Sequence, residues 1–214
     1  MAHRFAEIAF TEGVKAVQAR YGTRAQNQRL EERAGPNAAL REREAAFIAE
    51  RDSFYLATVS ETGWPYVQHR GGPKGFLKVV GPRTLAFADF GGNRQFISVG
   101  NAARNDRVAL FLMDCANQLR LKILGRVKVQ DIGDAPPDLV FEVELPGYPG
   151  RVERVMIVEV EAFDWNCSQH IAPRFTEAEV RAAAQPLRER IAALEAELAR
   201  MRAGAASGSA TVRE

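Results

Sequence analysis

The sequence is poor in the residues that build metal centres and disulfide frameworks. Its 214 residues include only two cysteines and three histidines. Cys115 and Cys167 lack the paired spacing of a zinc site, and His3, His69 and His170 are scattered along the chain. Neither set follows a known metal-ligand spacing. We therefore expect reduced thiols and no bound metal.

Long apolar runs and blocks of one charge are missing as well. No stretch of 18 residues is apolar enough for a membrane-spanning helix, and MAHRFAEIAF shows no apolar run of signal-peptide length. The 29 basic and 27 acidic residues are spread along the chain, whereas nucleic-acid binders concentrate basic residues on one face. We expect a cytoplasmic protein that binds neither a membrane nor nucleic acid.

Several enzyme signatures are also absent. The sequence has no P-loop ending in Gly-Lys-Ser/Thr, no Rossmann glycine pattern, no His-Glu-x-x-His and no Gly-x-Ser-x-Gly. Function must therefore be sought in less specific polar clusters.

The patterns that are present predict a mainly β protein. Residues 1–51 are polar and helical in character, and Thr11 can cap a helix that carries Val14, Val17 and Tyr21 on one face. Strand patterns then follow at short spacing, interrupted by one helical segment at 94–105. They cover 53–60, 66–70, 75–81, 84–90, 107–114, 119–132 and 156–163. The early strands leave no room for helical crossovers, so an antiparallel barrel is expected.

The C-terminal part changes pattern again. Apolar residues recur at alternating steps of four and three, which is a heptad seam of about three heptads: Val180, Ala184, Leu187, Ile191, Leu194, Leu198 and Met201. We expect an amphipathic helix over 173–203 that starts or kinks at Pro186, and a disordered tail over 204–214. The seam can pair with a partner subunit or lie against the chain's own barrel, and the sequence leaves both open.

Three polar clusters carry the candidate functional residues. The first contains His69, Arg70 and Gly71, the second contains Asn93, Arg94 and Gln95, and the third contains Trp165, Asn166, Gln169 and His170. Glycines and arginines near a helix start can bind an anion, and a tryptophan can stack on a flat ring. Each cluster also has a plain interpretation: a turn, an ordinary helix N-terminus capped by Asn93, and a polar loop held by one tryptophan. Cys167 with His170 indicates a thiolate nucleophile only weakly, because no third group orients the pair.

In their order along the chain, these features resemble the flavin-nucleotide-binding split barrels related to pyridoxamine 5′-phosphate oxidase. The resemblance covers residues 40–172 and rests on FYLATVSETGWPYVQHRGGPKGFLKVVG, TLAFADFGGNRQFISVGNAARNDRVALFLMD, LRLKILGRVKV and DWNCSQHI. It implies an antiparallel six-stranded split β-barrel over 52–172, flanked by N-terminal helices and the C-terminal amphipathic helix. It also implies a homodimer that binds FMN at two sites between its subunits.

The resemblance assigns roles to the polar clusters. The first meets the flavin, the second holds its ribityl and phosphate groups, and the third reaches it from the other subunit. Arg120 stands five residues before Gly125, where the family often has a glutamine facing the ring, and Lys122 is expected on the same strand face. Positive charge there would stabilise the anionic reduced flavin.

One departure bears on the activity. True oxidases carry a C-terminal Arg-Leu-His motif that grips the pyridoxal substrate, whereas this chain has NCSQHIAPRFT. The expected function is therefore an FMN-dependent oxidoreductase acting on another small organic substrate. A flavin-binding carrier or sensor without turnover is the alternative, and a dimeric scaffold without flavin is a third.

Overall fold

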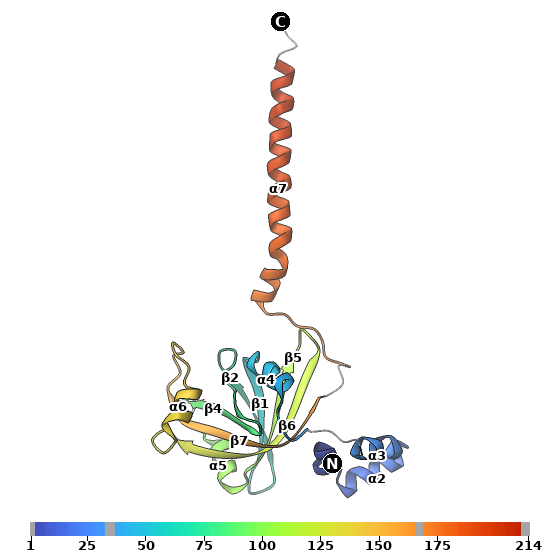
Figure 1. Ribbon diagram of the computed structural model, residues 1–214, viewed down its shortest axis with the longest axis vertical. Coiled ribbons are helices and arrows are strands. Elements are labelled where there is room, and N and C mark those ends of the chain that lie inside the picture. Colours follow the sequence, from blue (N-terminus) through green and yellow to red (C-terminus); the bar gives the residue numbers. More distant parts are fainter. Residues whose placement is uncertain (1–2, 33–36, 166–168, 211–214) are drawn as a thin grey trace. The chain divides into compact units, whose positions relative to one another are not determined.

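The computed structural model describes residues 3–32, 37–165 and 169–210. The chain forms two compact units, Met1–Ile171 and Ala172–Glu214. The first unit contains a strongly curved sheet with short helices, and the second contains a single long helix, α7 (Figure 1). The candidate site residues of the first two clusters all belong to the first unit.

Seven strands form one antiparallel sheet in the order β2-β1-β5-β6-β7-β4-β3. Their bounds are β1 Ser53–Val59, β2 Pro65–Gly71, β3 Lys78–Gly81, β4 Thr84–Phe90, β5 Arg107–Asp114, β6 Leu119–Asp131 and β7 Val152–Trp165. Each of the seven strand patterns in the sequence corresponds to one of these strands, whereas the six strands implied by the family resemblance are one too few. No ladder joins β2 to β3 in the described part of the chain, so hydrogen bonds do not close the sheet into a barrel.

The sheet curls around its core, so strands that are distant in the sheet order meet. Phe54 of β1 stacks on Phe76 with ring centroids 5.5 Å apart, and it meets Phe87 of β4 edge-on at 5.1 Å. Arg70 of β2 forms an ion pair with Asp89 of β4. This curvature brings the polar ends of β2 and β4 to one place.

Helices surround the sheet at its start and in two of its connections. They are α1 Arg4–Ala9, α2 Glu12–Arg20, α3 Arg24–Glu32, α4 Glu42–Ala49, α5 Ile97–Arg104 and α6 Pro137–Val143. Thr11 caps α2 as predicted, because its Oγ1 accepts a hydrogen bond from the Val14 amide at 3.4 Å. The apolar side chains of α2 are exposed rather than packed: Val14, Val17 and Tyr21.

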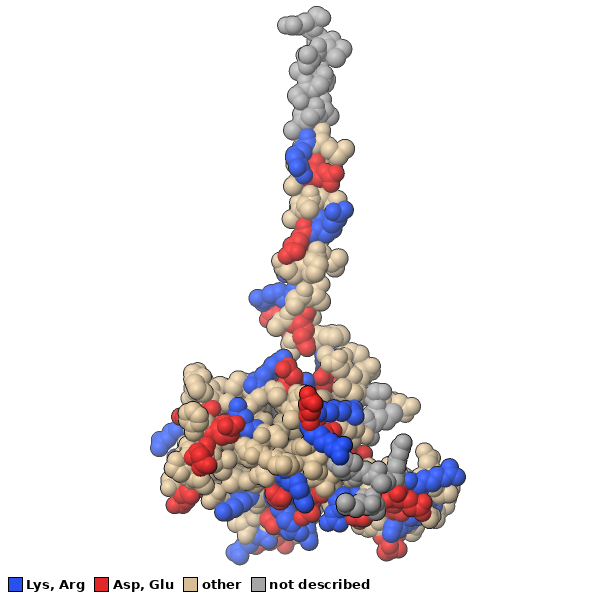
Figure 2. Space-filling view, viewed as in Figure 1, with Lys and Arg blue, Asp and Glu red and all other residues tan. Residues whose placement is uncertain are grey.

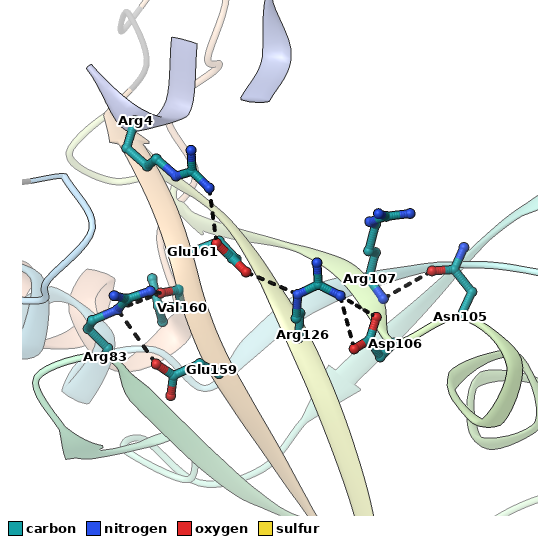
Figure 3. Close-up of polar contacts among 9 residues, drawn as sticks. All are labelled: Arg4, Arg83, Asn105, Asp106, Arg107, Arg126, Glu159, Val160 and Glu161. Atoms are coloured by element: carbon teal, nitrogen blue, oxygen red, sulfur yellow. Dashed lines mark hydrogen bonds and ion pairs between the residues drawn. The ribbon is translucent and has the colours of Figure 1, made fainter. Parts of the chain in front are cut away.

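Polar contacts tie α1 to the sheet (Figure 3). Arg4 donates to Glu161 of β7 at 3.4 Å, and Arg126 of β6 donates to the same carboxylate at 3.0 Å. Arg126 also donates to both oxygens of Asp106, at 2.9 and 3.1 Å. The hydrogen bond from Arg126, helped by that from Arg4, lowers the pKa of Glu161. The N-terminal segment is thus joined to the middle of β7.

The helix α7 runs from Glu177 to Ala210. It begins after Thr176, whose Oγ1 accepts from the Glu179 amide at 3.2 Å while the Glu179 carboxylate accepts from the Thr176 amide at 2.7 Å. This capping box places the start upstream of Pro186, which lies inside the helix. The helix continues past residue 203, where the sequence predicts its end, as far as Ala210; residues 211–214 lie outside the described part. No helix within the described ranges is both long and apolar enough to cross a membrane.

Candidate functional site

A pocket of about 190 Å³ lies where β2, β4, β7 and the start of α5 meet. Alternate residues of β2 line it, namely Tyr66, Gln68 and Arg70, because successive side chains of a strand point to opposite faces. The segment between β4 and α5 supplies much of the remaining wall, including Asn93, Arg94 and Gln95. The structure therefore brings together Arg70 and the whole second cluster.

One buried carboxylate organises this pocket. Asp89 is 4% exposed and lies between two arginines. Arg70 pairs with one of its oxygens, and Arg154 of β7 donates to the other from Nε at 2.8 Å. Burial acts to lower the pKa of Arg154, but hydrogen bonds to Asp89 and Glu153 outweigh burial and raise that pKa. Arg154 therefore stays charged in the pocket.

Arg70 retains unused donor capacity at this site. Its two terminal nitrogens contact Asp89 and the Met156 sulfur, the latter at 3.8 Å. Its Nε is buried and has no hydrogen-bond partner in the described part of the chain. An unpaired buried donor costs about 1–3 kcal/mol. An acceptor supplied by a ligand would remove this cost.

The loop before α5 holds its polar groups through an unusual backbone. Arg94 and Phe96 adopt left-handed conformations, with φ of 59° and 53°. Asn93 accepts a hydrogen bond from the Gln95 amide at 3.2 Å, and α5 starts only at Ile97. Asn93 therefore stabilises the loop and is not the cap of the helix. Arg94 is exposed at the pocket and can reach an anion that enters it.

A second group of predicted residues occupies the opposite face of the sheet. His69 and Gly71 alternate with Arg70 along β2, so they face away from the pocket. The strand registers place Tyr55, His69, Phe111 and Lys122 in one row across β2, β1, β5 and β6. This row borders an almost wholly apolar hollow of about 380 Å³, whose lining includes Tyr55, Phe111 and Lys122.

Two basic residues on this face differ in how they are held. The Lys122 ammonium lies 2.9 Å from a carboxylate oxygen of Asp164 and 4.8 Å from the ring centre of Phe5. The Arg120 Nε is buried without a hydrogen-bond partner. Among the described residues, the buried side-chain nitrogen or oxygen atoms without a hydrogen-bond partner belong to Arg70 and Arg120. Both residues are predicted ligand residues.

Trp165 makes its contacts within its own chain. Its Nε1 donates to Glu44 of α4 at 2.8 Å, its ring meets Phe47 at 4.8 Å, and Arg43 lies 4.3 Å above it. These contacts anchor α4 to the end of β7. Asn166 lies outside the described residues, and Gln169 and His170 are exposed in a turn. A role of this third cluster at a ligand stays a prediction.

Residues 40–143 match the family described as pyridoxamine 5′-phosphate oxidase. The match spans 104 of the 214 residues. The match includes β1 to β6, and with them Arg70, Arg94 and Arg120. It ends before β7, so Arg154 and Trp165 lie outside it. The search of curated proteins finds no match.

Several solved structures are similar to part of this chain. A Lactobacillus delbrueckii protein named after pyridoxamine 5′-phosphate oxidase is 21% identical; the alignment covers 60% of this chain and 96% of that one, with a TM-score of 0.46. HupZ of Group A Streptococcus is 16% identical, with 64% and 99% covered and a TM-score of 0.46. An FMN-binding protein of Syntrophomonas wolfei is 12% identical, with 72% and 97% covered and a TM-score of 0.42.

Sequence reasoning missed Arg154, which is the second arginine paired with Asp89. A signal was present in the strand pattern. Arg154 has the same parity along β7 as Met156, Val158 and Val160, which are buried. A charged residue at an inward position of a strand needs a partner, and here that partner is Asp89.

Proposed function

We propose that this chain is an FMN-binding flavoprotein that acts as an oxidoreductase on a small organic substrate. The observation that carries the proposal is the pocket around Arg70, with its buried unpaired Nε. The charged residues that line it are Arg70, Arg94 and Arg154 against Asp89 alone. Excess positive charge and free N–H donors suit a phosphate dianion.

The pocket is smaller than a site for a whole cofactor. Pockets for ligands of that size measure about 300–1,000 Å³, against about 190 Å³ here. We assign the pocket to the phosphate and the adjoining ribityl chain, for which Asn93 and Gln95 offer amide groups. The ring system must then lie outside it.

The arrangement of the remaining residues supports a homodimer. Arg70 faces the pocket, whereas His69, Gly71, Arg120 and Lys122 lie on the opposite face of the sheet. These four residues cannot contact a flavin bound in the pocket of their own protomer. They can contact a flavin bound in the pocket of a partner protomer. The apolar hollow on the same face offers a surface that excludes water from a flat ring. We therefore place each site between two copies.

The residues then have distinct tasks. FMN, when bound, supplies hydride transfer to or from the substrate. Arg70, Arg94 and Arg154 bind its phosphate. Asp89 positions Arg70 and Arg154. Arg120 holds positive charge near the ring, where its unpaired Nε can donate a hydrogen bond. Oxidation of pyridoxamine phosphate is not proposed, because the chain lacks the Arg-Leu-His motif.

The absorbance spectrum of the purified protein tests flavin binding. We expect a yellow protein, or a colourless one that turns yellow with added FMN, and mass spectrometry should identify FMN in the released small molecule. A protein that takes up no flavin would refute the proposal and favour a scaffold.

A reduction assay separates enzyme from carrier. NADH or NADPH is added to the FMN-loaded protein, and the flavin absorbance is followed. Bleaching at catalytic rates supports the oxidoreductase. Persistent colour with both reductants favours the non-catalytic carrier or sensor, for which the long exposed helix α7 offers a surface that could bind a partner.

A further inference from the structure

The helix α7 carries an apolar stripe along its length. Six large side chains of the stripe are between 46% and 67% exposed: Val180, Leu187, Ile191, Leu194, Leu198 and Met201. Such a stripe is unfavourable in water and needs a partner. The charges beside the stripe identify which partner fits.

The spacing assigns every position of the heptad. Val180, Leu187, Leu194 and Met201 occupy d, and Ala184, Ile191 and Leu198 occupy a. The flanking g positions hold Arg190 and Glu197, and the e positions hold Arg181, Arg188, Glu195 and Arg202. In a parallel pair of helices, each g residue meets the e residue five positions later on the partner.

Parallel pairing matches opposite charges at both charged g positions. Arg190 meets Glu195 of the second helix, and Glu197 meets Arg202. The two-fold symmetry doubles this to four attractive pairs, and no like charges meet. An antiparallel pair with the seams fully overlapped also forms four attractive pairs, Arg188 with Glu195 and Arg190 with Glu197, but it sets Arg181 against Arg202 twice. The parallel pair alone has no like charges opposed. Figure 2 shows basic and acidic side chains interspersed along α7.

We propose that α7 forms a parallel, in-register two-stranded coiled coil with α7 of a second copy of this chain. The centre of the seam agrees, because Ile at a with Leu at d favours two parallel strands, and Ile191 lies between Leu187 and Leu194. Pro186 occupies a c position, on the outside of such a pair. The inference does not depend on flavin binding.

Cysteine cross-linking of the full-length chain tests the pairing. In a Cys115→Ser, Cys167→Ser background, Met201→Cys places a thiol at a d position that faces its own copy across the parallel pair. Ala196→Cys is the matched control at f, on the outer side. We expect Met201→Cys to form inter-chain disulfides on the order of tenfold faster than the control. In the antiparallel alignment the two 201 positions lie about 26 Å apart along the axis.

Charge exchange tests the register. In the Met201→Cys chain, Arg190→Glu opposes Glu195 of the partner and should slow cross-linking about fivefold. Adding Glu195→Arg restores opposite charges in the parallel register alone, so the rate should recover. Equal rates for the two cysteine positions, or an Arg190→Glu variant without effect, would overturn the proposal. So would a double variant that fails to recover, or a helix that packs on its own sheet domain and forms no inter-chain disulfide.

Discussion

The single carboxylate of Asp89 pairs with two arginines. This excess of positive charge is the basis of the proposed phosphate site. A buried carboxylate usually needs one cationic partner, and Arg154 alone would satisfy that need through its 2.8 Å hydrogen bond. The second arginine, Arg70, carries a buried Nε without a partner. The unpaired Arg70 donor supports the proposal that this cluster binds an anion.

Arg94 offers the cleanest test at the residue scale, because it is exposed and has no part in the core. Arg94→Ala removes one charged donor from the phosphate, and we expect FMN to bind about tenfold more weakly. Quenching of FMN fluorescence on titration with the protein measures this. Arg104→Ala changes an exposed arginine at the C-terminal end of α5, which does not line the pocket, and as the control it should leave the affinity unchanged. Equal affinities of both variants would remove Arg94 from the site.

Arg120 is expected to tune the bound flavin. Its positive charge stabilises the anionic reduced form, so Arg120→Ala should lower the reduction potential by about 30 mV, which corresponds to about 1.4 kcal/mol for two electrons. Lys122→Ala should change the potential less, because Asp164 already neutralises that ammonium. Spectroelectrochemical titration of the FMN-loaded protein gives both values. A potential unaffected by Arg120→Ala with FMN bound would contradict the role.

At the scale of elements, the strands were predictable and the division of the site was not. Apolar alternation such as Leu119, Leu121 and Ile123 marks a strand wherever one face is buried. The cluster His69-Arg70-Gly71 is continuous in sequence, yet strand alternation sends Arg70 to the pocket and its neighbours to the other face. Arg70 and Arg154 meet at Asp89 only because the sheet is strongly curved. Local sequence patterns do not predict that curvature.

Gly125 marks the bulge between β6 and β7 and shows why this strand tolerates no side chain there. A Cβ would lie 2.6 Å from the Glu159 carbonyl oxygen and 2.8 Å from a Val158 methyl. We expect Gly125→Ala to lower the free energy of unfolding by about 1–3 kcal/mol, as measured by urea denaturation. Gly100→Ala in α5 meets nothing within 4 Å and should raise it by about 0.5–1 kcal/mol. The opposite order would show that the bulge relaxes freely.

The link between α1 and the sheet gives a pH dependence. The pKa of Glu161 is below its ordinary value of 4.5 in the folded chain. Its ionised form therefore adds stability that is fully present above pH 4.5 and is lost as the pH falls through the folded-state pKa. Glu161→Gln should lower the melting temperature by about 1–2 °C at neutral pH, and the difference should shrink below pH 4.5.

Thermal melts of the wild type and the Glu161→Gln variant between pH 3 and pH 7, with about one melt per pH unit, check this prediction. Glu142→Gln changes an exposed glutamate of α6 and serves as the control. A gap between wild type and Glu161→Gln that stays constant down to the lowest pH would show that the Arg126 and Arg4 contacts contribute no charge-dependent stability.

At the scale of the whole molecule, the proposed flavin site and the proposed coiled-coil helix belong to different units. All described residues assigned to FMN lie within Met1–Ile171, and the heptad seam lies within Ala172–Glu214. In the proposed dimer, two separate surfaces act on the same two copies. If the sheet domains pair first, the helices meet at the high effective concentration of tethered segments, which compensates for a seam of only about three heptads.

Removal of residues 172–214 tests this division. The shortened chain keeps Ile171, which is buried and accepts a hydrogen bond from Gln118 at 2.8 Å through its carbonyl oxygen. We expect it to remain dimeric by light scattering and to bind FMN with unchanged affinity, because the sheet domain supplies both faces of each site. A monomer that still binds FMN would mean that one copy forms the complete site and that α7 alone holds the dimer. A monomer that loses FMN would leave the site between copies but make the helix its main support.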